Sequence, residues 1–94
     1  MAVYVDDAIW ERWERRWCHL LADDADELHA FAAALGCRRD RFQSRPSRPW
    51  DDHYDIDEDR RRDAVARGAI EIGRRELCAQ IARKRAAALA ALGR

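Results

Sequence analysis

Residues 53–72, HYDIDEDRRRDAVARGAIEI, restrict the possible folds of this chain more than any other stretch. His53–Ile56 has the residue types of a strand, and Asp57 follows it at the N-cap position of a helix that has acids in its first turn. Gly68 is a typical helix stop, and Ala69–Ile72 has the pattern of another strand. A strand, a helix and a second strand in so short a segment indicate an α/β architecture.

The remaining segments continue this alternation. Ala2–Val5 and Trp17–Ala22 are expected strands that both end at acids, and Phe42 is expected to close a short strand. Asp24 and Glu27 have capping-box spacing at the start of a helix that ends before Gly36. We therefore predict a small α/β or α+β domain with three or four short, mainly parallel strands, and with helices over residues 24–35, 57–67 and 73–92.

Three tryptophans precede the second expected strand. Trp10, Trp13 and Trp17 have the i, i+3, i+7 spacing of one helical stripe. Such a stripe can cover the core, or it can form a dimer or partner surface, because tryptophan is enriched at interface hot spots. Self-association through these tryptophans or through the 73–92 helix therefore remains open.

The charge pattern limits the partners of the chain. Its 94 residues are expected to form one domain over 1–94, with a core over 1–72 and a basic C-terminal helix over 73–92. The 18 basic and 18 acidic residues cancel, and they alternate in acidic and basic blocks along the chain. Acidic blocks would repel a long polyanion, so long nucleic acid is a less favoured ligand than a nucleotide or a phosphate.

Cysteine usage and hydropathy indicate a cytoplasmic protein. Cys18, Cys37 and Cys78 are widely spaced and form no CxxC pair, which argues against a disulfide framework or a structural zinc knuckle. The N-terminal residues have no signal-peptide pattern, and the longest apolar run is far shorter than a membrane span. We expect no membrane association.

Histidines and acids near strand ends are the candidates for chemistry. A histidine titrates near neutral pH and can act as a general acid or base, so His19, His53 and Asp55 are the catalytic candidates. Mixed nitrogen and oxygen ligands suit a divalent metal ion. The candidates for that role are Asp6, Asp23, His19, His29 and His53. The same residues could instead form a buried polar network that holds a thin core together.

Arginines supply the candidate binding groups. Arg61 lies on the inward face of its expected helix and therefore needs a carboxylate, carbonyl or phosphate partner. Arginines and aromatic residues are interleaved between Cys37 and Asp52, a composition that suits phosphate or nucleotide contact, although a solvated loop has the same composition. The basic face of the 73–92 helix is a further cationic surface.

Several ordered segments carry a resemblance to a known family. They are VYVDD at 3–7, CHLLADDADELHAFAAALG at 18–36, Phe42-Gln43, HYD at 53–55, Arg60-Arg61, Ala64 and Gly68-Ala69. On these residues the chain resembles the small bacterial and phage proteins of the domain of unknown function 4031 family, over roughly residues 1–70. The resemblance implies that the candidate histidines and acids belong to one place with Arg61, and its segments add the binding candidates Gln43, Tyr54 and Arg60.

The chain departs from the family pattern at three places. Trp10–Trp17 replaces a glycine-containing segment, Arg41 replaces an aromatic residue, and the polar pair Arg62-Asp63 replaces apolar residues. No activity is implied by the resemblance. Two functions remain: a binding or interaction module for a nucleotide, a phosphate ligand or a protein partner, or a small phosphoester or nucleotide hydrolase with a His/Asp/Arg site and a divalent metal. No P-loop, GxGxxG, HExxH or nucleophile elbow is present.

Overall fold

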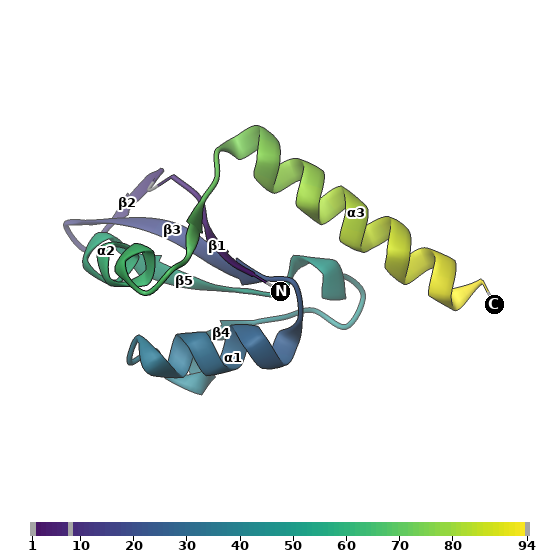
Figure 1. The fold of residues 1–94 in the computed structure, drawn as a ribbon, viewed down its shortest axis with the longest axis horizontal. Helices are drawn as coiled ribbons and strands as arrows, with labels where there is room; N and C mark the ends of the chain where they lie inside the picture. The colour runs from purple at the N-terminus through teal and green to yellow at the C-terminus, as the bar shows by residue number, and fades with distance from the viewer. Residues whose placement is uncertain (1, 8, 94) are drawn as a thin grey trace.

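A computed structural model of the chain describes residues 2–7 and 9–93. Within these ranges the chain forms strands, two short 3-10 helices and three α-helices (Figure 1). The strands are β1 (Val3–Val5), β2 (Trp10–Arg12), β3 (Arg15–Ala22), β4 (Phe42–Gln43), β5 (His53–Asp57) and β6 (Ile70–Glu71). The helices are α1 (Ala25–Ala34), η1 (Arg39–Arg41), η2 (Pro49–Asp51), α2 (Glu58–Ala66) and α3 (Arg74–Leu92).

The strands form one mixed sheet. Its order is β4-β5-β3-β1-β6, and β2 pairs with β3 beside this path. The predicted α/β class is confirmed, but the expected mainly parallel pairing is wrong, since only β1 and β6 pair in parallel among the described strands. Parallel neighbours need a long crossover, usually a helix. The chain from β1 to β3 instead passes through β2 and returns antiparallel.

The predicted tryptophan helix is also wrong. Residues 10–17 form a β-hairpin in which Trp10 is the direct partner of Trp17, and the indole Nε1 of Trp17 donates to the carbonyl of Arg12 at 2.9 Å. The two turn residues, Trp13 and Glu14, have φ angles of 52° and 59°. A two-residue turn with both central φ angles positive matches the twist of a hairpin, but it usually contains glycine or asparagine. The sequence therefore lacks the usual turn signal here.

The hydrophobic core lies on one face of the sheet. Val5, Leu20, Tyr54 and Ile56 point from adjacent strands to this face and are almost fully buried. They pack against α1 and α2, which lie along the same side of the sheet in Figure 1. Because side chains alternate along a strand, the residues between them point to the opposite face.

The predicted helix ends are confirmed for α1 and α2. The Asp24 carboxylate accepts from the Glu27 backbone N–H at 2.8 Å, and the Asp57 carboxylate accepts from that of Arg60 at 2.9 Å. Gly36 and Gly68 follow the two helices with φ angles of 81° and 103°, which favour glycine. These caps place the start of α2 directly at the end of β5.

Helix α3 leaves the sheet after Gly73. It packs near η2, and its C-terminal part projects away from the body (Figure 1). The Lys84 ammonium group donates to the Ala22 carbonyl at 2.5 Å and ties the middle of the helix to the end of β3. No helix within the described ranges is both long enough and apolar enough to cross a membrane.

Candidate functional site

Two histidines and an aspartate meet on the sheet face opposite the core. His19 of β3 is the direct register partner of Asp55 of β5, and His53 lies two residues before Asp55 on the same strand. One potential ligand atom from each of the three residues lies within 4.8 Å of the others. The rings of His19 and His53 make an edge-to-face contact with 4.9 Å between their centroids. The three residues are hereafter called the histidine cluster.

Each histidine ring is held through its Nδ1 atom. The Nδ1 of His19 is 2.7 Å from an oxygen of Asp6, whose side chain is 3% exposed. The other Asp6 oxygen accepts from the backbone N–H of His19 at 2.6 Å. The Nδ1 of His53 is 2.6 Å from the backbone carbonyl of Asp51. A carbonyl only accepts hydrogen bonds, so the Nδ1 of His53 carries a proton.

Asp55 joins the cluster to β4. Its Oδ1 lies 3.4 Å from the Nε2 of His53, and its Oδ2 accepts from the side-chain amide of Gln43 at 2.5 Å. Burial favours the neutral carboxyl, but the hydrogen bonds from His53 and Gln43 outweigh it and lower the pKa of Asp55. Burial likewise opposes the charged imidazolium, yet the bonds to Asp55 and to the Asp51 carbonyl raise the pKa of His53.

A cavity of about 250 Å³ opens beside the cluster, and its lining includes Asp55 of the cluster and Gln43, the hydrogen-bond partner of Asp55. Among the described residues that line this cavity, Asp55 is the only carboxylate, and four are arginines. These arginines are Arg12, Arg38, Arg41 and Arg60. Three tryptophans, Trp10, Trp13 and Trp17, supply aromatic walls, and the Trp10 ring also lies 4.9 Å from that of His19. We call this space the arginine cavity.

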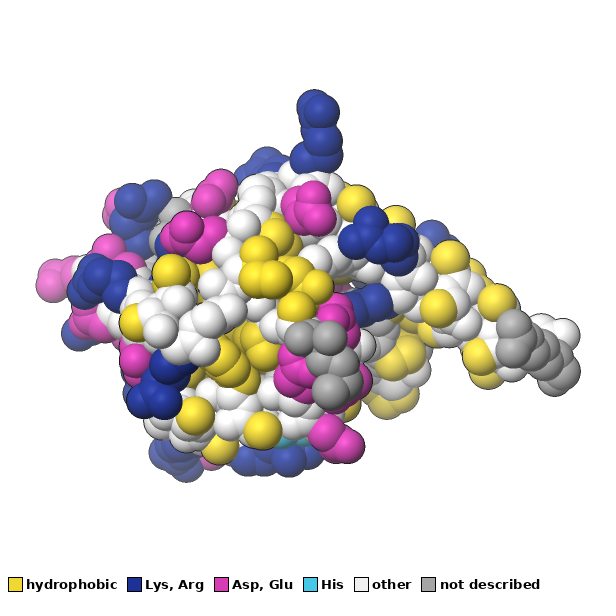
Figure 2. Space-filling view, viewed as in Figure 1, with side chains coloured by type: hydrophobic (Ala, Val, Ile, Leu, Met, Phe, Trp, Pro, Cys, Tyr) yellow, Lys and Arg dark blue, Asp and Glu magenta, His cyan; other side chains and the backbone are white. Residues whose placement is uncertain are grey.

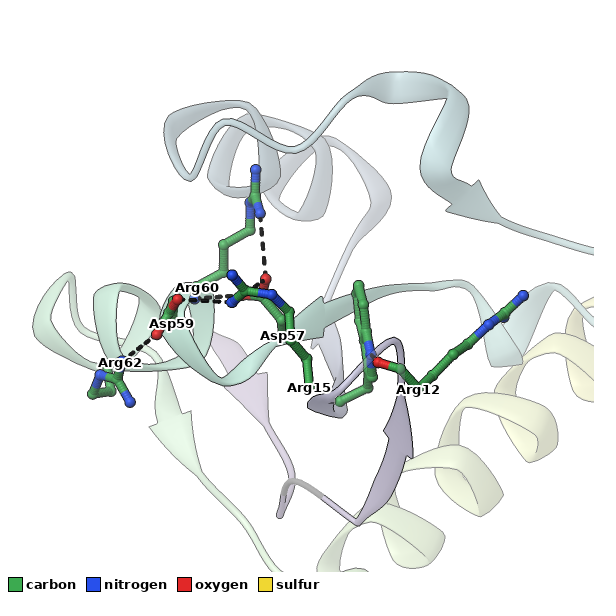
Figure 3. Close-up of polar contacts among 7 residues, drawn as sticks. Arg12, Arg15, Asp57, Asp59, Arg60 and Arg62 are labelled. Carbon is green, nitrogen blue, oxygen red and sulfur yellow. Dashed lines mark hydrogen bonds and ion pairs between the residues drawn. The ribbon is translucent and has the colours of Figure 1, made fainter.

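A network of ion pairs fixes one side of the arginine cavity. Figure 3 shows Arg15, on β3, reaching toward Asp57 and Asp59 at the start of α2, at distances of 3.4 and 2.8 Å. Arg60 lies 3.7 Å from the same Asp57 carboxylate, and Arg12 extends from the neighbouring β2. The network connects the hairpin to α2, so that the arginines of both elements border one cavity.

Three sequence-predicted site residues lie elsewhere. The ring of His29 and the hydroxyl of Tyr54 are 2.9 Å apart, and His29 also packs edge-on against Phe42. Tyr54 points to the core face because it alternates with His53 and Asp55 along β5. Asp23 lies at the far end of β3, where its carboxylate accepts from the backbone N–H of Ala2 at 2.7 Å.

Arg61 contacts the site only through the backbone. Its Nε donates to the Asp6 carbonyl at 2.8 Å, and its NH1 lies 3.0 Å from the Glu71 carboxylate. These are the carbonyl and carboxylate partners that an inward arginine needs. Arg61 thus connects α2 to the residue that follows β1 and to β6. Asp6, whose carbonyl accepts from Arg61, also contacts the His19 ring through its carboxylate. Its neighbour Arg60, by contrast, lines the arginine cavity.

Sequence reasoning missed two components of the site. One is the Asp51 carbonyl that orients His53, which no side-chain pattern could reveal. The other is Arg12, which joins the cavity only because residues 10–17 form a hairpin. The direct pairing of Trp10 with Trp17 is consistent with a turn midway between them, but the turn residues themselves give no signal. Arg38 and Arg41 do belong to the arginine-rich segment noted in the sequence.

Comparison with known families places most of the chain in one of them. The family model described as protein of unknown function (DUF4031) matches residues 3–84. The match includes the histidine cluster, the residues that line the arginine cavity, and the first part of α3. No curated protein and no solved structure matches the chain.

Proposed function

The chain belongs to the DUF4031 family of proteins of unknown function, and we propose that it binds a phosphate-bearing ligand of the nucleotide type in the arginine cavity. The observation that carries the proposal is the composition of the cavity wall, in which four arginines face a single carboxylate. Arginine presents a planar fork of donors that matches phosphate oxygens, and it stays charged at any physiological pH.

Aromatic groups favour a nucleotide over inorganic phosphate. Trp13 is 63% exposed and lies at the cavity rim, where the guanidinium of Arg12 stacks 4.1 Å from the centre of its ring. An exposed indole offers a stacking surface to a nucleobase, worth about 1–3 kcal/mol per base. The arginines would hold the phosphate groups while Trp13 contacts the base.

Arg41 is the most informative residue for a binding test. It lines the cavity, and within the described part of the chain no carboxylate pairs with it, whereas Arg38 pairs with Asp40 at 2.6 Å. Calorimetric titration of wild-type protein with ADP, adenosine and pyrophosphate, in the presence of a chelator, compares base and phosphate contributions. We expect ADP to bind most tightly and R41Q to weaken it about 10- to 100-fold, since one charge-assisted bond is lost.

Arg48 provides the matched control. It is exposed, belongs to the same arginine-rich segment, and does not line the arginine cavity. R48Q removes the same charge from the same part of the chain, so it should bind ADP like the wild type. Equal binding by R41Q and R48Q, or no heat from any phosphate compound, would contradict the proposal.

Phosphoester hydrolysis is a second candidate, favoured by one specific observation. Asp55 belongs to the histidine cluster and also lines the arginine cavity, so a phosphate held at the Asp55 side of the cavity would approach the cluster that contains the two histidines. A histidine beside a bound phosphoester can act as a general acid or base. Release of nitrophenolate from a nitrophenyl phosphodiester should then depend on His53 and not on His29. Activity that survives H53A would exclude this function for the cluster.

Self-association is supported by a separate feature, the apolar side chains along α3. Leu89 and Leu92 are 49% and 81% exposed, and Figure 2 shows hydrophobic side chains along the projecting part of the molecule. Light scattering of wild type and L89E measures whether this surface pairs two copies, with W13A as the test of the tryptophan surface. A monomeric wild type would exclude both surfaces as dimer contacts.

A further inference from the structure

The histidine cluster has the donor set of a metal site. Two imidazole nitrogens and one carboxylate oxygen are ligands that Zn²⁺, Fe²⁺ and Mn²⁺ accept together. The Nε2 of His53 and the Oδ1 of Asp55 are already 3.4 Å apart. Two donors at about 2.1 Å from one ion have about this separation. One nitrogen of His19 also lies within 4.8 Å of a ligand atom of each of the other two residues, and side-chain rotation would have to close the remaining distance to one ion.

The hydrogen bonds of the histidines select the ring nitrogen that would bind. Both Nδ1 atoms are engaged, that of His19 by the Asp6 carboxylate and that of His53 by the Asp51 carbonyl. A proton on Nδ1 leaves the lone pair of a neutral imidazole on Nε2. Metal-binding histidines almost always donate their second ring N–H to a carboxylate or a carbonyl in this way. The two rings are therefore oriented as ligands by different segments, the residue that follows β1 and the last residue of η2.

The carboxylate ligand is oriented as well. Gln43 donates to the Oδ2 of Asp55 and leaves the Oδ1 directed to His53. Gln43 and Asp55 both line the arginine cavity, so an ion in the cluster would face that space. Three protein ligands leave at least one coordination position of the ion for water or a ligand oxygen. An open position on the Asp55 side of the ion would face the arginine cavity, where the arginines favour negatively charged groups.

We propose that His19, His53 and Asp55 bind one divalent transition-metal ion, of the Zn²⁺, Fe²⁺ or Mn²⁺ class, through two imidazole nitrogens and one carboxylate oxygen. Asp6, Asp51 and Gln43 position these ligands without touching the ion. The ion accepts an oxygen of water or of a phosphate group at its open position. This goes beyond ligand binding in the arginine cavity, because it assigns a metal site beside that cavity, and Asp55 belongs to both.

The test uses Zn²⁺ and Co²⁺ with protein freed of metal by a chelator that is then removed. Calorimetry gives stoichiometry and affinity for Zn²⁺, and the visible absorption of Co²⁺ reports the ligand set. We expect one ion per chain in the wild type, a loss of affinity of at least about 100-fold in H19A and H53A, and a smaller loss in D55N. H29A is the matched control, because His29 hydrogen-bonds to Tyr54 on the core face.

Two readouts keep the outcome independent of folding and of phosphate binding. Circular dichroism and the near-isosteric D55N show whether a variant that loses metal is still folded. R41Q, which alters only the arginine cavity, should bind Zn²⁺ like the wild type, even if no nucleotide binds. The proposal is overturned if the folded wild type takes up less than one ion per chain at micromolar concentrations, or if H29A loses metal as H19A does.

Discussion

His19 on β3 and Asp55 on β5 are direct partners across an antiparallel ladder, so both side chains leave the sheet on the same face. Tyr54, one residue earlier on β5, is paired with Leu20 and points with it into the core. The site and the core are thus two faces of the same pair of strands. This relationship makes separate tests of chemistry and of stability possible.

Asp6 should determine how tightly the cluster binds a metal ion. D6N keeps an oxygen that can accept from the His19 backbone N–H, but it removes the charged partner of the His19 ring. Loss of such a supporting carboxylate lowers metal affinity about 10- to 100-fold. Zinc titration of D6N measures the effect, and D7N, which changes the adjacent exposed aspartate, is its control. Unchanged affinity in D6N would mean that His19 needs no orienting partner.

The hairpin turn should become more stable with glycine at position 14. Glu14 has a φ angle of 59°, a conformation that costs a residue with a Cβ atom about 1–2 kcal/mol. Glycine relieves this cost but loses more entropy on folding, so E14G should raise the free energy of unfolding by up to about 1 kcal/mol. Urea denaturation measures the change.

E11G is the comparison for the turn. Glu11 lies in β2 with ordinary strand geometry, so glycine there gains no strain relief and should destabilise the protein. The opposite order of stabilities would show that the positive φ angles of the turn are not strained in solution.

Arg61 should contribute to stability far more than its neighbour Arg62. The Arg61 side chain is 19% exposed and binds both the Asp6 carbonyl and Glu71, whereas that of Arg62 is 71% exposed and pairs with Asp59, which is itself exposed. R61A leaves a buried carbonyl without its donor, which costs roughly 1–3 kcal/mol. R62A should change the free energy of unfolding by less than about 0.5 kcal/mol.

R61K refines the prediction for Arg61. Lysine keeps the charge but cannot reproduce the two-directional donor geometry of the guanidinium, so R61K should fall between wild type and R61A. Chemical denaturation at neutral pH ranks the variants. Equal stabilities of R61A and R62A would show that the tie from α2 to β1 contributes nothing.

Cys18 should make the protein less stable at alkaline pH. Burial raises the pKa of its thiol from the ordinary 9.0 to about 12. The folded state therefore favours the protonated thiol, and this contribution is complete below pH 9 and is lost as the pH rises toward 12. Between pH 8 and pH 10 the loss is at most about 1.4 kcal/mol.

The pH effect is measured as a slope rather than as an absolute stability. C18A creates a small void and so changes the absolute stability. Its free energy of unfolding should nevertheless fall less between pH 8 and pH 10 than that of the wild type, because the variant lacks the thiol whose titration causes part of the decrease. C78A is the control, because Cys78 is exposed in the folded protein. Identical slopes for wild type and C18A would contradict the shifted pKa of Cys18.

Local sequence was sufficient for the elements whose signals are local. At the start of α1 and of α2, a carboxylate accepts a hydrogen bond from the backbone N–H three residues later in the chain. Gly36 and Gly68 follow the two helices, at positions where the φ angle is positive. The fold class and the approximate positions of β1, β3 and β5 follow from composition and spacing for the same reason. An element that depends on neighbours in the sequence can be identified from the sequence.

The hairpin shows where local reasoning ends. The spacing of Trp10, Trp13 and Trp17 fits one stripe of a helix, and the same spacing also places Trp10 opposite Trp17 across a two-residue turn. The choice was decided by pairing with β3, whose far end continues into the core through Cys18 and Leu20. Because the chain returns at once, β1 and β3 pair antiparallel, and the mainly parallel sheet is not formed.

The candidate site also has features that the sequence determines and features that depend on the tertiary structure. Sequence alone determined the residue types, the histidines, acids and arginines, and the helix ends that hold some of them. Only the tertiary structure decided which of them meet: the β3–β5 register joins His19 to Asp55, and strand alternation sends Tyr54 to the core, where its hydroxyl meets His29. The physical reason is that register and strand order arise from contacts between residues far apart in the chain, which no local pattern encodes.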